Sequence, residues 1–324
     1  MLFILLVVLF VLAIMIGRYS ISFKTFVDII IGNPNVSSIE KNIVINLRIP
    51  RTIIALLTGM ALSISGLVYQ ELFNNKLVSP DLLGVSSGAS VGAAFAIVLG
   101  FSGLLISVFS FTFGLITMFL TILISKVFKS FSSVFLLLAG VIVGGFMSSL
   151  TGLFKYLATS DRQLSEITFW LLGSFSASTF DGVLIVLPFV IIGVVILYLL
   201  RWKINVLALG HDESTSLGLN YKRLRMIIII CSTLLTACTV AISGVIGWVG
   251  LVIPHIARLL VGRNSAKTIP LTILLGSCFM IVVDILSRSF TSTEIPLSVV
   301  TGFLGTPIFL TLLYIKRGIV NERN

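Results

Sequence analysis

The segment Lys203-Ile-Asn-Val-Leu-Ala-Leu-Gly-His-Asp-Glu-Ser-Thr-Ser-Leu-Gly-Leu-Asn-Tyr-Lys-Arg-Leu224 is a polar island between two long apolar stretches, near residues 182–200 and 226–243. It stands out in a chain of 324 residues that is 57% hydrophobic and only 10% charged. The island cannot lie in the hydrocarbon core of a bilayer, because its charged and polar groups would lose their hydration there. The flanking stretches are long enough to cross a membrane, so the island is predicted to connect two transmembrane helices.

Apolar residues recur within the island at spacings that suit short amphipathic helices. Leu207 and Leu209 are followed by Leu217 and Leu219. Helices of this kind pack against a membrane surface or a partner protein. The island is therefore a candidate contact surface for another protein.

The rest of the chain is dominated by apolar stretches. A mean hydropathy of +1.16 indicates a polytopic membrane protein and excludes a soluble one. The first stretch lacks a basic amino-terminal region and a small-residue cleavage site, which favours a retained helix over a signal peptide. We expect an all-α fold with one membrane domain over residues 1–324. Ten transmembrane helices are predicted, near residues 2–17, 52–70, 84–100, 104–125, 134–154, 182–200, 226–243, 245–261, 269–287 and 297–315.

The distribution of basic residues predicts the orientation. With the amino terminus inside, the inner segments carry fourteen Lys and Arg residues and the outer segments eight. This excess places the island and both termini in the cytoplasm. The net charge of +10 is spread singly and in pairs at helix ends, so topology explains it better than nucleic-acid binding does.

Motifs of enzymes and nucleotide sites are absent from the sequence. There is no Gly-x-x-x-x-Gly-Lys-Ser/Thr loop, so any ATP must be hydrolysed by a partner. His211 and His255 are isolated, and neither His-Glu-x-x-His nor Gly-x-Ser-x-Gly occurs. Cys231, Cys238 and Cys278 lie in apolar stretches without the spacing of a metal site, which predicts small core residues. We expect no catalytic residue and no metal or cofactor bound by this chain.

Charged residues near the outer helix ends allow several interpretations. Asp284 and Arg288 are spaced i, i+4 and can neutralise each other. Alternatively, Arg288 faces outward together with Arg48 and Arg51, and three outward arginines would suit an acidic partner. For Arg48 and Arg51, snorkelling to the interface is a third possibility.

Polar residues at the inner helix ends are candidate gate or interface residues. Gln70 and Glu71 end the second predicted helix, and Pro254, His255 and Arg258 lie in the eighth. For His255 a structural role is favoured over a transport role.

Small residues recur at helical spacing in three segments, Gly84–Gly92, Gly140–Gly144 and Gly244–Gly250. This spacing predicts closely packed helices. The alternative is that these helix starts line a wide pathway, where bare backbone can face protein or water.

Taken in order, segments along nearly the whole chain resemble the FecCD family of permeases, the membrane subunits of ABC importers for iron-siderophores, haem and cobalamin. The segments that carry the resemblance are Arg48-Ile-Pro-Arg51, Gly59-x-x-Leu62-x-x-Ser65-Gly66-x-x-x-Gln70, Ser79-Pro-Asp-Leu-Leu-Gly-Val-Ser-Ser-Gly-Ala89, Trp170-Leu-Leu-Gly-Ser174, Leu207-Ala-Leu-Gly-His-Asp-Glu-Ser-Thr-Ser-Leu-Gly218, Gly244-Val-Ile-Gly-Trp-Val-Gly-Leu-Val-Ile-Pro-His-Ile-Ala-Arg258, Asp284-x-x-x-Arg288, Glu294-Ile-Pro296 and Gly302-Phe-Leu-Gly-Thr-Pro307.

The resemblance implies a set of partners and residue roles. It implies a second permease subunit, identical or paralogous, a cytoplasmic ABC ATPase dimer that holds ATP and magnesium, and an external binding protein that delivers the chelate. By resemblance, the arginines Arg48, Arg51 and Arg288 receive glutamates of the binding protein. A coupling segment at about 204–222 would enter a cleft of the ATPase, and its expected contact residues are Leu207, Leu209, Gly210, Asp212, Glu213, Leu217 and Gly218.

Two departures from the family pattern concern the inner side. Asn75-Lys-Leu-Val78 stands where the family usually has Asn-Pro-Leu-Ala, so the backbone there is free to be helical. His211 stands where the family often has a small or acidic residue.

We therefore expect the permease subunit of an ABC importer that moves a ferric siderophore across the cytoplasmic membrane of a bacterium. Haem or cobalamin is the alternative cargo. An ion-coupled secondary transporter would need a carboxylate near mid-membrane, and Asp284, which comes nearest to this, lies at a helix end.

Overall fold

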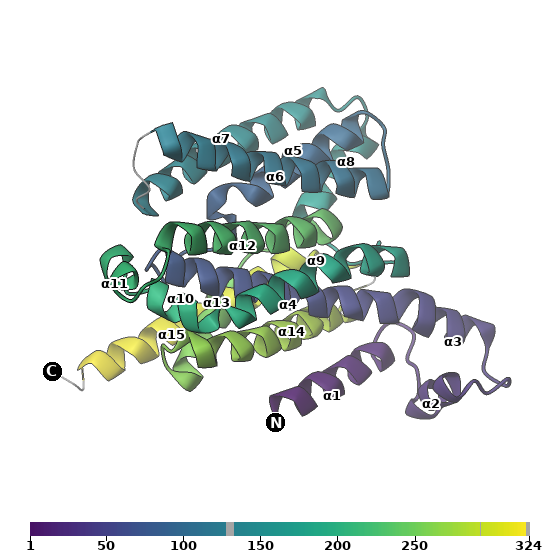
Figure 1. Ribbon diagram of the computed structural model, residues 1–324. Helices are drawn as coiled ribbons and strands as arrows, with labels where there is room; N and C mark the ends of the chain where they lie inside the picture. Colours follow the sequence, from purple (N-terminus) through teal and green to yellow (C-terminus); the bar gives the residue numbers. More distant parts are fainter. Residues whose placement is uncertain (128–132, 292, 322–324) are drawn as a thin grey trace.

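All secondary structure in the part of the chain that the structure describes is helical. The computed structural model describes residues 1–127, 133–291 and 293–321. Most helices run roughly parallel or antiparallel to one another (Figure 1). The elements are α1 (Leu2–Met15), α2 (Phe23–Ile31), α3 (Ser38–Asn42), the π-helix η1 (Ile43–Arg48), α4 (Ile49–Leu72), the 3₁₀-helix η2 (Pro80–Leu83), α5 (Val85–Val98), α6 (Leu104–Val127), α7 (Ser133–Leu157), α8 (Asp161–Leu172), α9 (Phe180–Leu199), α10 (Arg201–Leu207), α11 (His211–Ser216), α12 (Tyr221–Ser243), α13 (Val249–Val261), α14 (Ser265–Ser289) and α15 (Leu297–Asn321).

The ten predicted transmembrane helices all have counterparts. Within the described residues, six helical stretches are long and apolar enough to cross a membrane. One is Ser38–Leu72, which joins α3, η1 and α4, and the others are α6, α7, α9, α12 and α14. In α7 the apolar span starts at Val134. Four shorter apolar helices, α1, α5, α13 and the Leu297–Leu312 part of α15, account for the others. The prediction of an all-α, roughly ten-helix membrane protein is confirmed.

Several shorter helices were not predicted, although local capping signals mark two of them. The hydroxyl of Ser160 accepts a hydrogen bond from the backbone N–H of Gln163 at the start of α8, at 3.3 Å. Ser22 caps α2 in the same way through the N–H of Thr25, at 3.0 Å, and Gly32 ends α2 in the left-handed region. Such residues favour helix ends, because they satisfy backbone groups that the helix itself leaves unpaired.

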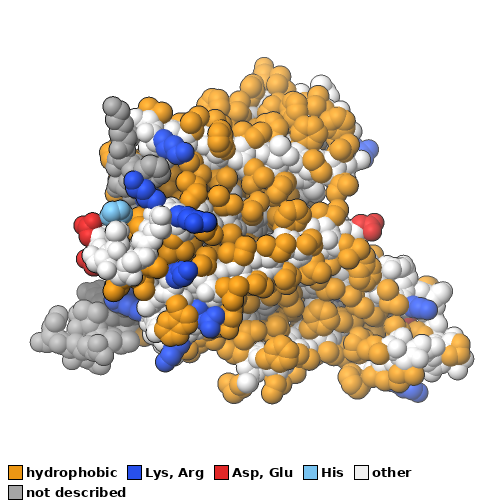
Figure 2. All heavy atoms as spheres, in the orientation of Figure 1, with side chains coloured by type: hydrophobic (Ala, Val, Ile, Leu, Met, Phe, Trp, Pro, Cys, Tyr) orange, Lys and Arg blue, Asp and Glu red, His pale blue; other side chains and the backbone are white. Residues whose placement is uncertain are grey.

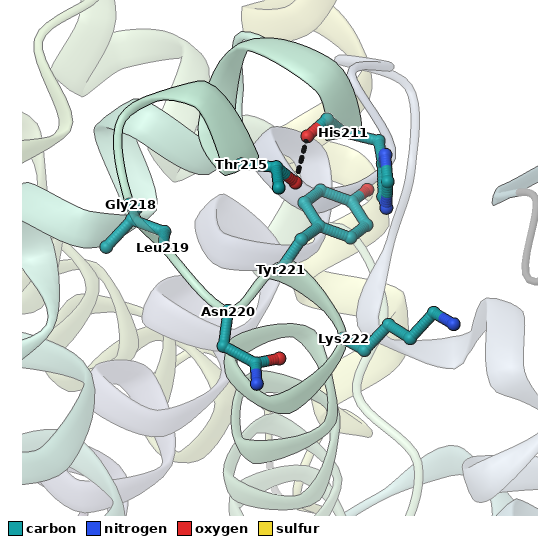
Figure 3. Close-up of a pocket in the computed structure, with 7 residues that line it drawn as sticks. All are labelled: His211, Thr215, Gly218, Leu219, Asn220, Tyr221 and Lys222. Atoms are coloured by element: carbon teal, nitrogen blue, oxygen red, sulfur yellow. Dashed lines mark hydrogen bonds between the residues drawn. The ribbon is translucent and has the colours of Figure 1, made fainter.

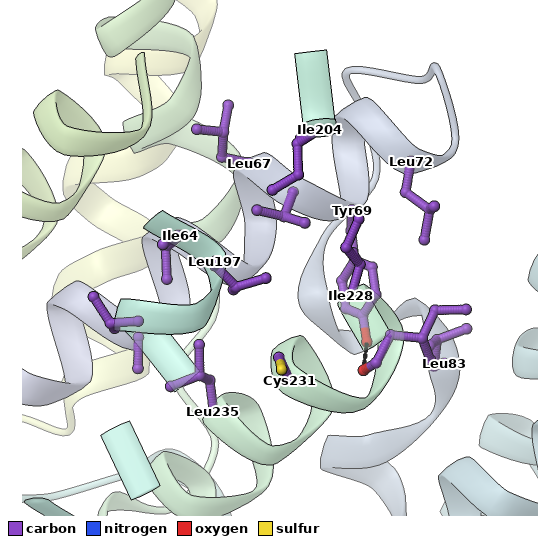
Figure 4. Close-up of a cluster of buried hydrophobic side chains, with 14 of the residues drawn as sticks. Ile64, Leu67, Tyr69, Leu72, Leu83, Leu197, Ile204, Ile228, Cys231 and Leu235 are labelled. Atoms are coloured by element: carbon purple, nitrogen blue, oxygen red, sulfur yellow. Dashed lines mark hydrogen bonds between the residues drawn. The ribbon is translucent and has the colours of Figure 1, made fainter. Parts of the chain in front are cut away.

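Helix α4 lies at the centre of the fold. It packs against α9, α12, α13 and α14, and its buried side chains, including Ile64, Leu67 and Tyr69, join those of α9 and α12 in the largest hydrophobic cluster (Figure 4). Helix α12 lies between α5–α8, in the upper part of Figure 1, and α4, α13 and α14, in the lower part. Cys231 and Cys238 of α12 pack in the same cluster, as expected of small core residues.

Pairs of glycines bring the backbone of α4 against its neighbours. Gly59 faces Gly276 of α14, and Gly66 faces Gly250 of α13, so closely that a Cβ atom at any of the four would overlap atoms of the neighbouring segment. Gly88 and Gly92 of α5 lie equally close to α6, and Gly140 of α7 to Leu82. The glycines at these positions therefore allow close packing of helices, which is one of the two interpretations of the small-residue segments.

Replacing Gly66 with alanine should destabilise the protein by about 1–3 kcal/mol, the usual range for forcing extra atoms into a packed core. The rigid backbone of Gly250 opposes the new methyl group, so the two helices must move apart. Unfolding in a graded series of denaturing detergent measures the change. Gly145→Ala is the control, because a Cβ there meets no atom within 4 Å. Equal stability of the two variants would contradict the packing argument.

Candidate coupling surface and charged clusters

The polar island folds as two short helices, α10 and α11, joined by a turn at Gly210. Gly210 has φ 118° and ψ 179° and Gly218, after α11, has φ 81°, backbone conformations that favour glycine. The buried hydroxyl of Ser214 donates a hydrogen bond to the carbonyl oxygen of Val206 at 3.0 Å, which holds α11 against α10. The short helices that the leucine spacing suits are present.

The predicted coupling residues divide between the core and the surface. Leu207 is buried in the central cluster and anchors α10 to the bundle. Leu209 and Leu217 are exposed by 59% and 64% of their surface, and the side chain of Asp212 by 97%. Gly218 and Glu213 are also exposed, whereas Gly210 is half-buried. The α11 region thus presents apolar and acidic side chains together on the surface of the molecule. Exposed apolar side chains with polar ones around them mark sites where proteins bind other proteins.

A shallow hollow of about 420 Å³ lies where α11 meets the start of α12 (Figure 3). The rings of His211 and Tyr221 meet edge to face, with their centres 5.0 Å apart. The hydroxyl of Thr215 donates to the backbone carbonyl of His211 at 2.7 Å. His211 therefore supports the shape of this surface, and Nδ1 of its ring lies 3.0 Å from the carboxylate of Asp212. Residues Gly218, Leu219, Asn220 and Lys222 complete the lining.

A buried network of charges lies at the opposite end of α4. Nε of Arg51 donates to Asp284 Oδ1 at 2.6 Å, and its Nη1 donates to Glu294 Oε1 at 2.6 Å. Arg288 pairs with the other oxygen of Asp284 at 3.2 Å. Asp284 is completely buried, so its charge is balanced by two arginines rather than by water. The predicted i, i+4 pair is present, whereas the partnership of Arg51 with Glu294 was not predicted.

Two arginines also bind the carboxyl-terminal end of α1. Arg48 donates from Nη1 to the carbonyl oxygens of Ile14, at 2.6 Å, and Met15, at 2.9 Å. Arg288 donates to the carbonyl oxygen of Ala13. The last carbonyl groups of a helix have no partner within it and carry partial negative charge, so cations stabilise this end. These contacts fix α1 against α4 and α14.

The three arginines predicted for docking do not face outward together in this conformation. Arg48, Arg51 and Arg288 are each between 6% and 8% exposed. Their guanidinium groups contact α1, Asp284 and Glu294 instead. Of the interpretations drawn from the sequence, internal neutralisation describes the observed contacts of Asp284 and Arg288, and docking stays a prediction.

A second charged cluster lies at the carboxyl-terminal end of α4. Arg258 of α13 pairs with Glu71 Oε1 at 3.1 Å and donates to the side-chain oxygen of Gln70. The side-chain amide of Gln70 donates to the carbonyl oxygens of Val78 and Gly250, both at 3.2 Å. This cluster joins α4, α13 and the loop that precedes η2.

That loop differs from one expectation. Residues 73–79 form turns rather than helix, and the side-chain oxygen of Asn75 accepts from the N–H of Leu77 at 3.0 Å. The loss of the family's proline has therefore not extended α4. Within the loop, the carbonyl oxygen of Val78 accepts a hydrogen bond from the side-chain amide of Gln70.

His255 has a local, structural environment. Its ring Nδ1 lies 2.9 Å from the carbonyl oxygen of Leu251, one turn earlier in α13. The ring also meets Phe309 of α15 edge to face, with the ring centres 5.2 Å apart. These contacts link α13 to α15 and agree with the favoured structural role.

The fold and its surfaces define a helical membrane protein of many spans. Within the described residues, six helical stretches are long and apolar enough to cross a membrane and four shorter apolar helices accompany them. Charge clusters lie at both ends of the central helix α4, and the exposed helix α11 lies between the apolar helices α9 and α12. The chain belongs to the FecCD transport family, whose pattern matches residues 5–315. The resemblance noted in the sequence is confirmed.

Individual relatives cover nearly the whole chain. It is 40% identical to the molybdate import system permease protein MolB of Haemophilus influenzae, over 98% of this chain and 96% of that protein. It is 38% identical to a Helicobacter pylori permease whose name assigns it to iron chelatin transport, over 97% of both. A solved structure described as a metal-chelate type ABC transporter in an inward-facing conformation has a TM-score of 0.88, with 38% identity and 97% coverage of both chains. This protein is accordingly a permease of an ABC importer.

Proposed function

We propose that this permease imports a ferric siderophore. The observation that carries the proposal is its similarity over nearly the full length to a permease named for iron chelatin transport. The metal-chelate type of the similar solved structure supports the same class of cargo. Haem and cobalamin are chelates of similar kind and stay as alternatives.

Molybdate is a second candidate, because MolB is 40% identical and also matches nearly the whole chain. The two candidates differ in chemistry. A ferric siderophore is a large organic chelate, whereas molybdate is a small oxyanion. Transport assays with both therefore distinguish them clearly.

The exposed α10–α11 segment is proposed to dock on a cytoplasmic ATPase dimer, which would hold ATP and magnesium. Basic side chains gather at the end of the molecule that carries α10 and α11 (Figure 2), as the positive-inside rule requires of a cytoplasmic face. This supports cytoplasmic termini and a location in the bacterial cytoplasmic membrane. The whole chain, residues 1–324, would act as one permease domain beside a second, identical or paralogous, permease subunit.

Docking of an external binding protein is proposed at the other end, through Arg48, Arg51 and Arg288. These side chains are buried, so docking requires that they first become accessible. Carboxylates of the binding protein can pair with them only after the end of α1 or the Glu294 side chain moves away. The groups that hold the arginines now are the carboxylates of Asp284 and Glu294 and the carbonyl oxygens of α1. A binding protein would offer carboxylates of the same kind.

Cells with and without the gene should differ in uptake of one labelled chelate. The panel comprises ferric hydroxamates, ferric catecholates, haem, cobalamin and molybdate. Loss confined to a ferric siderophore is the expected result. Loss confined to molybdate would replace the proposed cargo, and unchanged uptake of every compound, in cells without redundant importers, would contradict both candidates.

A further inference from the structure

An apolar groove of about 520 Å³ lies between α6 and α9, on the surface of α12. This volume falls in the range of sites for small molecules, roughly 300–1,000 Å³. One wall is formed by Leu104, Val108 and Phe111 of α6, and the other by Ile185 and Phe189 of α9. The groove plays no part in the coupling or docking surfaces described above.

The groove exists because α6 and α9 both pack on α12 while small side chains lie between them. Cys238 and Ala241 of α12 form its floor, and Gly182 lines it from α9. At the deeper end, the rings of Phe111 and Phe189 approach with centres 6.1 Å apart and close the space. From Leu104 to Phe111 the groove is about 10 Å long, at 1.5 Å per helical residue.

The open side of the groove faces hydrocarbon. Both wall helices are long and apolar enough to span a membrane, and the side chains of Leu104, Val108, Ile185 and Phe189 are exposed on the surface of the protein. Water does not fill such an apolar recess in a bilayer, and an empty one would lose the dispersion contacts of its lining. The acyl chain of a membrane lipid is flexible and apolar, and its shape suits a narrow groove of this kind.

The rim of the groove adds a preference for one headgroup. Asp181, in the first turn of α9, is exposed and is the charged member of the lining among the described residues. Its neighbours on the rim are Thr179 and Ser107. A carboxylate at the level of the interface attracts an amine and repels a second anion.

We propose that the groove holds one acyl chain of an aminophospholipid, with the headgroup amine at Asp181. Phosphatidylethanolamine has this chemistry. The lipid belongs to the leaflet at which α6 and α9 begin, opposite the α10–α11 end. The bound acyl chain fills the space between α6 and α9, which both pack on α12.

A photoreactive phosphatidylethanolamine with a diazirine on its acyl chain tests the site in the assembled transporter, reconstituted in bilayers. Cross-links should concentrate in peptides covering 104–111, 182–189 and 238–242. Ser107→Trp should abolish them by filling the groove, because Ser107 lines it. Ile116→Trp, at an exposed position further along the same helix and outside the lining, should leave them unchanged.

A second pair of variants tests the headgroup without filling the groove. Asp181→Lys should shift labelling from phosphatidylethanolamine to phosphatidylglycerol, whereas Asp161→Lys, at the exposed start of α8, should not. Cross-links spread evenly over the exposed faces of α6 and α9 and insensitive to Ser107→Trp would overturn the proposal. So would labelling that appears in the isolated chain and disappears in the assembled transporter, because a partner subunit would then occupy the groove.

Discussion

Replacing Glu213 with arginine should abolish uptake while leaving the membrane helices folded. Glu213 is exposed at the start of α11, beside the exposed Asp212 and Leu217. If this surface docks on basic groups of the ATPase, a reversed charge places like charges together. Association should then weaken by about tenfold or more, since each 1.4 kcal/mol changes affinity tenfold and like-charge contacts cost several kcal/mol.

Co-purification of a tagged ATPase with the permease, together with uptake of the labelled chelate, measures the effect. Glu40→Arg is the matched control, because Glu40 is an acidic residue in the short helix α3 at the opposite end of the molecule. Normal association and uptake by the Glu213 variant would show that α11 is not a coupling element. Equal loss in the control would show that a charge reversal acts through the fold instead.

Replacing Asp284 with alanine should destabilise the protein by about 3–5 kcal/mol, the usual effect of breaking a buried ion pair by removing one partner. Asp284 is fully buried between Arg51 and Arg288, so its removal leaves Arg288 without its carboxylate and Arg51 with Glu294 alone. Two poorly compensated cations would then stand close together in the fold. We expect a marked loss of folded protein.

Detergent-denaturation midpoints and the yield of monodisperse protein measure this effect. Asp28→Ala is the control, because Asp28 lies in the amphipathic helix α2 and bonds only locally, to the side chain of Asn33 at 3.1 Å. A double change of Asp284 and Arg288 to methionine should restore part of the stability, because it removes both charges. An Asp284→Ala variant as stable as the control would mean that the network does not hold α4 and α14 together.

The number and position of the long helices could be predicted from the sequence, because a membrane imposes one strong requirement on length and polarity. The two short helices of the island followed from the spacing of its leucines. Helix α8 was missed because Asp161, Arg162 and Glu166 make it too polar to be a span, although Ser160 and Gln163 form a recognisable cap.

The charged clusters could be predicted only where their members are neighbours in the sequence. The pair of Asp284 and Arg288 follows from helical spacing, but Glu294 approaches Arg51 across 243 positions. The burial of the three arginines depends on where α1 ends, which no local pattern encodes. Leu207 and Leu209 likewise differ in burial because Leu207 ends α10 and packs into the central cluster, whereas Leu209 lies in the turn that follows.

Transport by purified components tests the central claim most directly. The permease, its ATPase and the binding protein would be reconstituted in proteoliposomes, and accumulation of the labelled ferric siderophore would be followed. The account predicts that accumulation requires ATP and magnesium on the side of α10–α11 and persists when ionophores collapse ion gradients. Accumulation driven by an ion gradient without ATP would contradict it.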